Sequence, residues 1–242
     1  LWVRGVTYGP FRPDAEGCVY PAPEVVDDDF RRIAALGANA VRTYTPPPLW
    51  LLDRAARHGL RVLAGLAWEQ HVAFLDERRR AAAIEGRVRA SVAESAGHPA
   101  LLAWAVGNEI PASIVRWHGA RRVERFLERL CRAAREEDPG ALVTYVNYPS
   151  TEYLDLSFVD FAAFNVYLES EDRLAAYLAR LHNLVGDRPL VMAELGLDSR
   201  RNGLEAEAAS LAWQGGAGMG EGGAGAFVGA WCDAGIRGRG GR

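Results

Sequence analysis

Two glutamates stand where an enzyme would place a pair of reacting carboxyl groups. Glu109 closes the apolar run 100–109 (ALLAWAVGNE), and Glu194 lies near the end of the run 189–196 (PLVMAELG). Two carboxyl groups that face each other can cleave a glycosidic bond, because one protonates the leaving oxygen while the other attacks the anomeric carbon. Glycoside cleavage is therefore the first chemistry that this pair suggests.

Polar and aromatic side chains also recur where the other short apolar runs end. Aromatic faces stack on the apolar faces of sugar rings, and amide groups bind sugar hydroxyls, so this mixture is typical of a carbohydrate site. The residues that we expect to contact substrate are Arg42, Tyr44, Trp68, Asn108, Asn147, Asn165, Tyr167 and Trp231.

Eight short apolar runs alternate with longer amphipathic segments along the 242 residues. The apolar runs predict strands buried on both faces and the amphipathic segments predict helices, which together give parallel βαβ units. The expected strands are 2–9, 38–45, 60–68, 100–109, 141–148, 161–168, 189–196 and 225–231. The expected helices are 27–37, 48–59, 73–96, 113–137 and 171–184, and the link between strands five and six has room only for a turn.

This order of elements predicts a (β/α)8 TIM barrel over residues 1–234. A doubly wound open sheet would show the same local pattern, but eight strands with polar residues at their carboxyl ends favour closure. A barrel gathers those ends at one face, which would bring the two glutamates together. The glycine-rich segment 215–224 takes the place of helix seven, the last helix is expected to be incomplete, and the Gly/Arg tail 235–242 is expected to be flexible.

The ends of strands four and seven, VGNE and MAELG, resemble the catalytic strands of clan A retaining glycoside hydrolases. The resemblance is closest to the TIM-barrel domain of glycoside hydrolase family 2, and it runs from strand one to strand eight. It implies that Glu109 is the acid/base, that Asn108 binds the sugar 2-hydroxyl and that Glu194 is the nucleophile. A general acid needs a raised pKa and a nucleophile must stay ionised, so we expect the pKa values of the two glutamates to differ.

Three further positions carry the same resemblance. Arg42, in the segment NAVR, is similar to the arginine that orients the nucleophile. Tyr167 stands where the clan often has a tyrosine that hydrogen-bonds the nucleophile, and Trp231 resembles the tryptophan beneath the sugar subsite. The sequence departs from family 2 after the arginine, where it reads TYTP instead of the usual HYP.

Composition excludes several other classes of function. The net charge of -3 argues against nucleic acid as a partner, and the longest apolar run falls short of the roughly 18 residues that a membrane span requires. All 28 basic residues are Arg, so no Schiff-base or P-loop lysine exists. The histidines and the three cysteines lack ligand spacing, so we expect no metal and no cofactor. A GxGxxG match at 218–223 does not follow a strand and is not taken as a nucleotide site.

Alternatives to the enzyme remain open at this stage. The chain could be a barrel that binds glycan without cleaving it, or a barrel that acts on a phosphorylated metabolite. It could also be one domain of a larger carbohydrate-active protein. The glutamates could cap helices or pair with surface cations, Arg42 could pair with a structural carboxylate, and Tyr167 or Trp231 could pack at the rim. The sequence predicts an oligo- or polysaccharide as partner and leaves the sugar, the linkage and the cellular compartment open.

Overall fold

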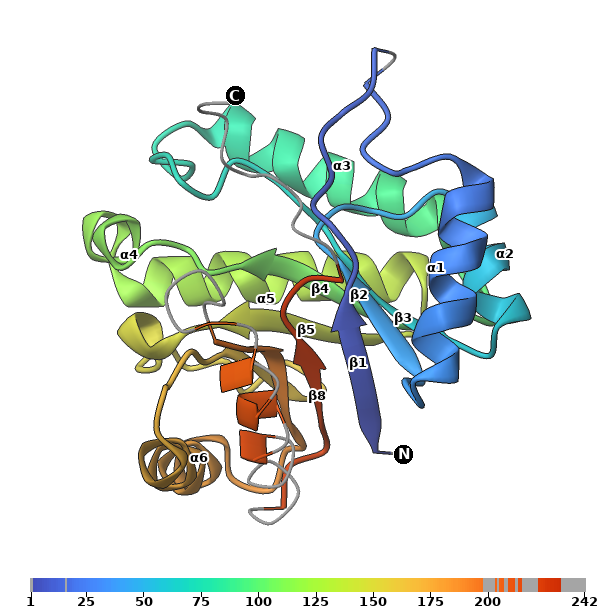
Figure 1. Ribbon diagram of the computed structural model, residues 1–242. Helices are drawn as coiled ribbons and strands as arrows, with labels where there is room; N and C mark the ends of the chain where they lie inside the picture. Colours follow the sequence, from blue (N-terminus) through green and yellow to red (C-terminus); the bar gives the residue numbers. More distant parts are fainter. Residues whose placement is uncertain are drawn as a thin grey trace, which may run out of the picture.

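Eight parallel strands close into a barrel in sequence order, and β8 pairs with β1 (Figure 1). The computed structural model describes residues 2–15, 17–197, 203, 205–206, 209–211, 213–214 and 222–231. The (β/α)8 barrel predicted from the sequence is confirmed. The strands are β1 (Val3–Thr7), β2 (Ala40–Thr43), β3 (Arg61–Gly65), β4 (Leu101–Asn108), β5 (Leu142–Asn147), β6 (Ala162–Asn165), β7 (Leu190–Leu195) and β8 (Gly225–Val228).

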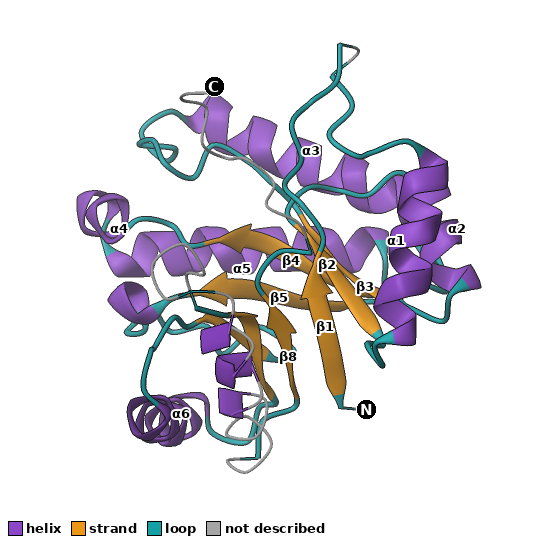
Figure 2. Cartoon of the chain, viewed as in Figure 1, coloured by secondary structure: helices purple, strands orange, loops and turns teal. Residues whose placement is uncertain are grey.

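Helices surround the barrel on its outer side (Figure 2). They are α1 (Pro23–Ala35), α2 (Leu49–Arg57), α3 (Arg78–Ser95), α4 (Ala112–His118), α5 (Ala120–Glu137) and α6 (Glu171–Val185). The short 3-10 helix η1 (Pro149–Thr151) links β5 to β6, as predicted. Between β7 and β8, residues 205–206, 209–211 and 213–214 are helical. Most of the glycine-rich segment and the whole tail 235–242 lie outside the described residues.

Three helix predictions were wrong in their limits. The helix expected over 73–96 begins at Arg78, because turns and bends occupy the residues before it. The first helix begins at Pro23 rather than at Asp27, because proline suits the first helical turn, where its missing N–H is not needed. The expected helix 113–137 is divided by Gly119, whose φ of 83° lies in the left-handed region that glycine adopts easily. The division leaves α4 as a separate short helix soon after Glu109.

Side chains of the strands fill the inside of the barrel. One buried cluster consists of residues on strands or next to them, among them Ala40, Leu63, Ala105, Ala193 and Phe227. The Phe227 ring lies so close to β1 that a Cβ on Gly5 would be 2.1 Å from it. This dense interior holds the strands in register, and thereby fixes where their carboxyl ends place the polar side chains.

Within the described ranges, no helix combines the length and the apolar character needed to cross a lipid bilayer. The same residues contain no group of three or more His, Cys, Asp or Glu side chains that could hold a metal ion. Cys18 is exposed and Cys131 is buried, and both are free thiols.

Candidate active site

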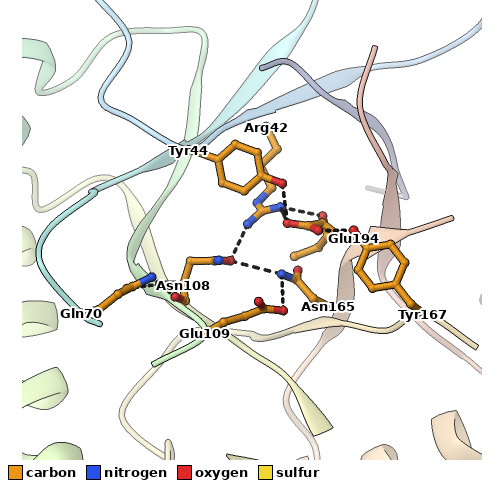
Figure 3. Close-up of polar contacts among 9 residues, drawn as sticks. Arg42, Tyr44, Gln70, Asn108, Glu109, Asn165, Tyr167 and Glu194 are labelled. Atoms are coloured by element: carbon orange, nitrogen blue, oxygen red, sulfur yellow. Dashed lines mark hydrogen bonds and ion pairs between the residues drawn. The ribbon is translucent and has the colours of Figure 1, made fainter. Parts of the chain in front are cut away.

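Arg42, on β2, joins two other strands at the carboxyl face of the barrel (Figure 3). Its Nη1 donates to Oε1 of Glu194 on β7 at 2.5 Å, and its Nη2 donates to Oδ1 of Asn108 on β4 at 2.7 Å. Arg42 is 2% exposed and Glu194 is 7% exposed. Their charges are therefore screened little by water and salt, and each needs the other to remain buried.

Glu194 receives two further hydrogen bonds, both from tyrosines. The Tyr44 hydroxyl donates to Oε1 at 2.7 Å, and the Tyr167 hydroxyl donates to Oε2. Burial alone would raise the pKa of Glu194, but the Arg42 charge and the hydrogen bonds outweigh it and hold this pKa below its usual value. Burial and the neighbouring carboxylate raise the pKa of both phenols, which therefore stay protonated as donors. The site thus holds Glu194 as an oriented carboxylate.

Glu109, directly after β4, has a different environment. Asn165 Nδ2, on β6, donates to Glu109 Oε1 at 2.9 Å and lies 3.3 Å from Asn108 Oδ1. Burial raises the pKa of Glu109. The Asn165 hydrogen bond and the Arg42 charge oppose this rise in part, and the negative charge of Glu194 adds to it. The pKa values of the two glutamates are thus displaced in opposite directions, as expected from the sequence, and one can carry a proton while the other stays ionised.

The backbone at Glu109 is unusual for a residue with a side chain. Its φ is 50°, in the left-handed region that residues other than glycine rarely adopt. The register of β4 against β5 also shifts between Ala105 and Asn108. Two backbone N–H groups hold the turn in place, since Glu109 N donates to Val146 O at 2.9 Å and Ile110 N donates to the Tyr145 hydroxyl at 2.8 Å. Such outliers concentrate at functional sites, where the surroundings force them.

A cavity of about 250 Å³ borders the polar cluster on the side of β2, β3 and β4. Arg42, Tyr44 and Asn108 belong both to its lining and to the hydrogen-bonded cluster. Trp68 and His71 line it as well. A larger cavity of about 510 Å³ lies along α5, away from the cluster, and has charged side chains of both signs in its wall. The smaller cavity is the better candidate for substrate, because part of the hydrogen-bonded cluster lines it, although neither Glu109 nor Glu194 is among its lining residues.

A family comparison agrees with this arrangement. The sequence pattern of "Glycosyl hydrolases family 2, TIM barrel domain" matches residues 12–239. This chain belongs to glycosyl hydrolase family 2. A comparison with curated protein sequences gave no significant match.

Solved structures of other proteins share this barrel. A Bacteroides uniformis β-glucuronidase superposes with a TM-score of 0.79 at 19% identity, over 94% of this chain and 30% of its own. A family 2 β-galacturonidase from Eisenbergiella tayi, bound to galacturonate, gives 0.79 at 18% identity, over 99% of this chain and 46% of its own. A family 5 protein from Streptomyces cattleya, in complex with Manβ1-4GlcNAc, gives 0.76 at 18% identity over 95% and 71%. At these identities the likeness shows the fold, and this chain spans less than half of the β-glucuronidase and of the β-galacturonidase.

Most of the residues predicted for the site lie together in this family 2 barrel. Hydrogen bonds connect Glu109, Glu194, Arg42, Tyr44, Asn108, Asn165 and Tyr167 in one cluster. Trp68 lines the neighbouring cavity, but its Nε1 donates to Val106 O at 2.7 Å and its ring packs edge-on against Phe74. The indole is thus an anchor for β4, and its contact with substrate stays a prediction.

Two predicted residues are not joined to the cluster by hydrogen bonds. Asn147 is 1% exposed, and its amide bonds within the turn after β5, to the Thr151 side chain and carbonyl and to Tyr148 N. Trp231 is partly buried against the hydrophobic core, and its backbone N donates to Thr7 O at 2.9 Å. Their contact with substrate stays a prediction.

Sequence reasoning missed two residues that surround Glu109. Gln70 contacts both the backbone N–H and the backbone C=O of Asn108, and the Tyr145 hydroxyl accepts a hydrogen bond from Ile110 N. Gln70 lies just after the third strand, so an extension of the strand-end criterion by a few residues could have found it. Tyr145 lies inside a strand, and nothing in its local sequence marks it.

Proposed function

We propose that this family 2 barrel is the catalytic domain of a retaining β-glycosidase or transglycosylase that acts on an oligo- or polysaccharide. The observation that carries the proposal is the pair of carboxyl groups in one cluster with opposite pKa displacements. Glu194 is kept ionised by Arg42 and two tyrosines, whereas burial favours the protonated form of Glu109. These are the states that a nucleophile and a general acid need before reaction.

In the first step, a Glu194 oxygen forms a bond to the anomeric carbon while the glycosidic C–O bond breaks. Glu109 gives its proton to the departing oxygen, which leaves as an alcohol. In the second step, the ionised Glu109 takes a proton from water or from a sugar hydroxyl. The oxygen of that acceptor bonds to the anomeric carbon as the ester to Glu194 breaks, and Glu109 is again protonated.

Asn108 and Arg42 have supporting roles in this proposal. The side-chain oxygen Oδ1 of Asn108 accepts from Arg42 and lies within reach of Asn165. The Nδ2 group of Asn108 is thereby left available for the sugar 2-hydroxyl. Arg42 keeps Glu194 charged and fixes its direction. Aromatic contacts with the sugar are assigned to Trp68 and Trp231.

Trapping of the covalent intermediate tests the proposal. The chain is incubated with 2-deoxy-2-fluoro glycosyl fluorides of the β-gluco, β-galacto, β-manno and β-glucurono series and digested for mass spectrometry. We expect one series to add a fluoroglycosyl group to the peptide that contains Glu194, with no adduct in Glu194→Gln. Binding of glycan without any adduct across the panel would instead identify a non-catalytic glycan-binding barrel.

A further inference from the structure

The loop after β3 continues the contacts of that strand with β4 by means of side chains. Backbone pairing between the two strands reaches Gly65 and Ala105, and Leu66 N donates to Ala105 O at 2.9 Å. Beyond that point, Trp68 Nε1 donates to Val106 O at 2.7 Å. Gln70 makes the next contact along β4, at Asn108, and is the last of this series before Glu109.

Gln70 contacts both backbone polar groups of Asn108 (Figure 3). Its Oε1 accepts from Asn108 N at 3.0 Å, and its Nε2 donates to Asn108 O. The carboxamide is suited to this, because it offers one acceptor and one donor side by side, as a neighbouring strand would. The Gln70 side chain thereby supplies hydrogen bonds to the backbone of β4 beyond the point where the backbone of β3 pairs with it.

The second of these contacts bears directly on Glu109. One peptide group joins Asn108 to Glu109, and it consists of the Asn108 C=O and the Glu109 N–H. Gln70 donates to the Asn108 oxygen, and the Glu109 N–H donates to Val146 O. Rotation of this peptide group changes the φ of Glu109, which has the left-handed value of 50°. Loss of either contact would let the residue relax toward the common negative φ values, and its carboxyl would turn with it.

We propose that Gln70 is a positioning residue for the acid/base, which holds the Asn108–Glu109 peptide and so aims the Glu109 carboxyl. This inference rests on the proposed function for the role of Glu109. The geometric part does not depend on the proposed function, since the two Gln70 contacts, which we call the clamp, either fix the backbone of Asn108 and Glu109 or do not. Two kinds of measurement can therefore separate the two.

Hydrogen exchange tests the geometric part without any substrate. In Gln70→Leu, we expect the amides of Asn108 and Glu109 to exchange at least about tenfold faster than in the parent protein, with the strands β1 and β6 unchanged. Glu69→Gln is the matched control, because the neighbouring Glu69 is exposed and pairs with Arg87 instead. Unchanged exchange at Asn108 and Glu109 would overturn the proposal, whether or not the chain cleaves a glycoside.

The leaving-group dependence tests the catalytic part. Activated 2,4-dinitrophenyl glycosides need little protonation, whereas phenyl glycosides need the acid. For the series that the parent hydrolyses, we expect kcat/KM of Gln70→Leu to fall at least about tenfold more with the phenyl than with the dinitrophenyl glycoside. Equal losses with both substrates would overturn a role in aiming Glu109. If the parent hydrolyses neither, the proposed function fails while the exchange result still stands.

Gln70→Glu supplies a variant of nearly the same shape. A protonated carboxyl group can donate to Asn108 O and accept from Asn108 N, as the amide does, but a carboxylate can only accept and would repel the carbonyl. We therefore expect the ratio of its kcat/KM to that of the parent, measured with the phenyl glycoside, to rise by at least about tenfold as the pH falls from about 7 to about 5. A ratio independent of pH would contradict the clamp.

Discussion

Tyr44 and Tyr167 donate hydrogen bonds to opposite oxygens of the same carboxylate, that of Glu194. Arg42 adds a third donor on the Tyr44 side, and its guanidinium lies 4.7 Å from the centre of the Tyr44 ring. Oε1 therefore has two donors and Oε2 has one. Donors on both oxygens therefore hold the carboxylate against rotation.

Tyr44→Phe should make the ionised form of Glu194 less stable relative to the protonated form. The hydrogen bond from Tyr44 lowers the pKa of Glu194, so its loss raises that pKa, and the carboxylate is protonated at higher pH than before. We expect the acidic limb of the kcat/KM profile to move to higher pH. The exposed Tyr153 is the control, and Tyr153→Phe should leave the profile in place. An acidic limb that does not move in Tyr44→Phe would remove Tyr44 from the nucleophile's environment.

Arg42→Ala should reduce both turnover and stability. We expect kcat/KM to fall by at least about 100-fold, because Arg42 no longer orients the Glu194 carboxylate or keeps it ionised. Unfolding by urea should show a loss of about 3 kcal/mol, since a buried charge is left without its partner. Arg87→Ala, which breaks the exposed pair with Glu69, should cost less than about 1 kcal/mol.

The stability loss in Arg42→Ala should also depend on pH. Burial of Glu194 is then no longer offset, so its pKa in the folded state rises above that in the unfolded state. The folded state then binds the proton more tightly, and stability relative to the parent should fall as the pH rises from about 4 toward 7. A constant difference across this range would mean that Glu194 is not the unpaired charge.

Asn165→Ala should displace the basic limb of the pH profile of kcat/KM. The hydrogen bond from Asn165 opposes the raised pKa of Glu109, so its removal raises that pKa further. Glu109 would keep its proton to higher pH, and the basic limb of kcat/KM should move upward. Asn183→Ala, at an exposed position of α6, is the matched control and should leave the profile in place. A basic limb displaced equally by both variants would refute the assignment to Glu109.

The fold was predictable because buried strands and amphipathic helices leave periodic patterns that depend on local sequence alone. The break at Gly119 was missed since the apolar face continues on both sides of it, and only the backbone shows the left-handed turn. The convergence of polar side chains was predictable where a residue lies at the end of a strand, as Arg42, Glu109 and Glu194 do. The site was not predictable where a side chain inside a strand contacts a distant backbone group, as Tyr145 does with Ile110 N, because no local pattern encodes that pairing.

The two glutamates should respond differently to removal of their side chains. Glu194→Ala should lose cleavage, because no nucleophile remains to form the glycosyl-enzyme. Glu109→Ala should still react with dinitrophenyl glycosides, whose leaving group needs little protonation, and its intermediate should accumulate because no base activates water.

Added azide decides which glutamate has which role, because it attacks the anomeric carbon without a general base. In Glu109→Ala it should restore turnover and give the β-glycosyl azide, since the covalent intermediate is attacked from the face that the leaving group left. Product configuration is measured by NMR. In Glu194→Ala, azide takes the place of the missing nucleophile and should give the α-glycosyl azide by a single displacement. Formation of the β-azide by Glu194→Ala and of the α-azide by Glu109→Ala would mean that the two roles are exchanged. If both variants hydrolyse dinitrophenyl glycosides at the parent rate, neither glutamate is catalytic, and the cluster around Arg42 serves to bind glycan.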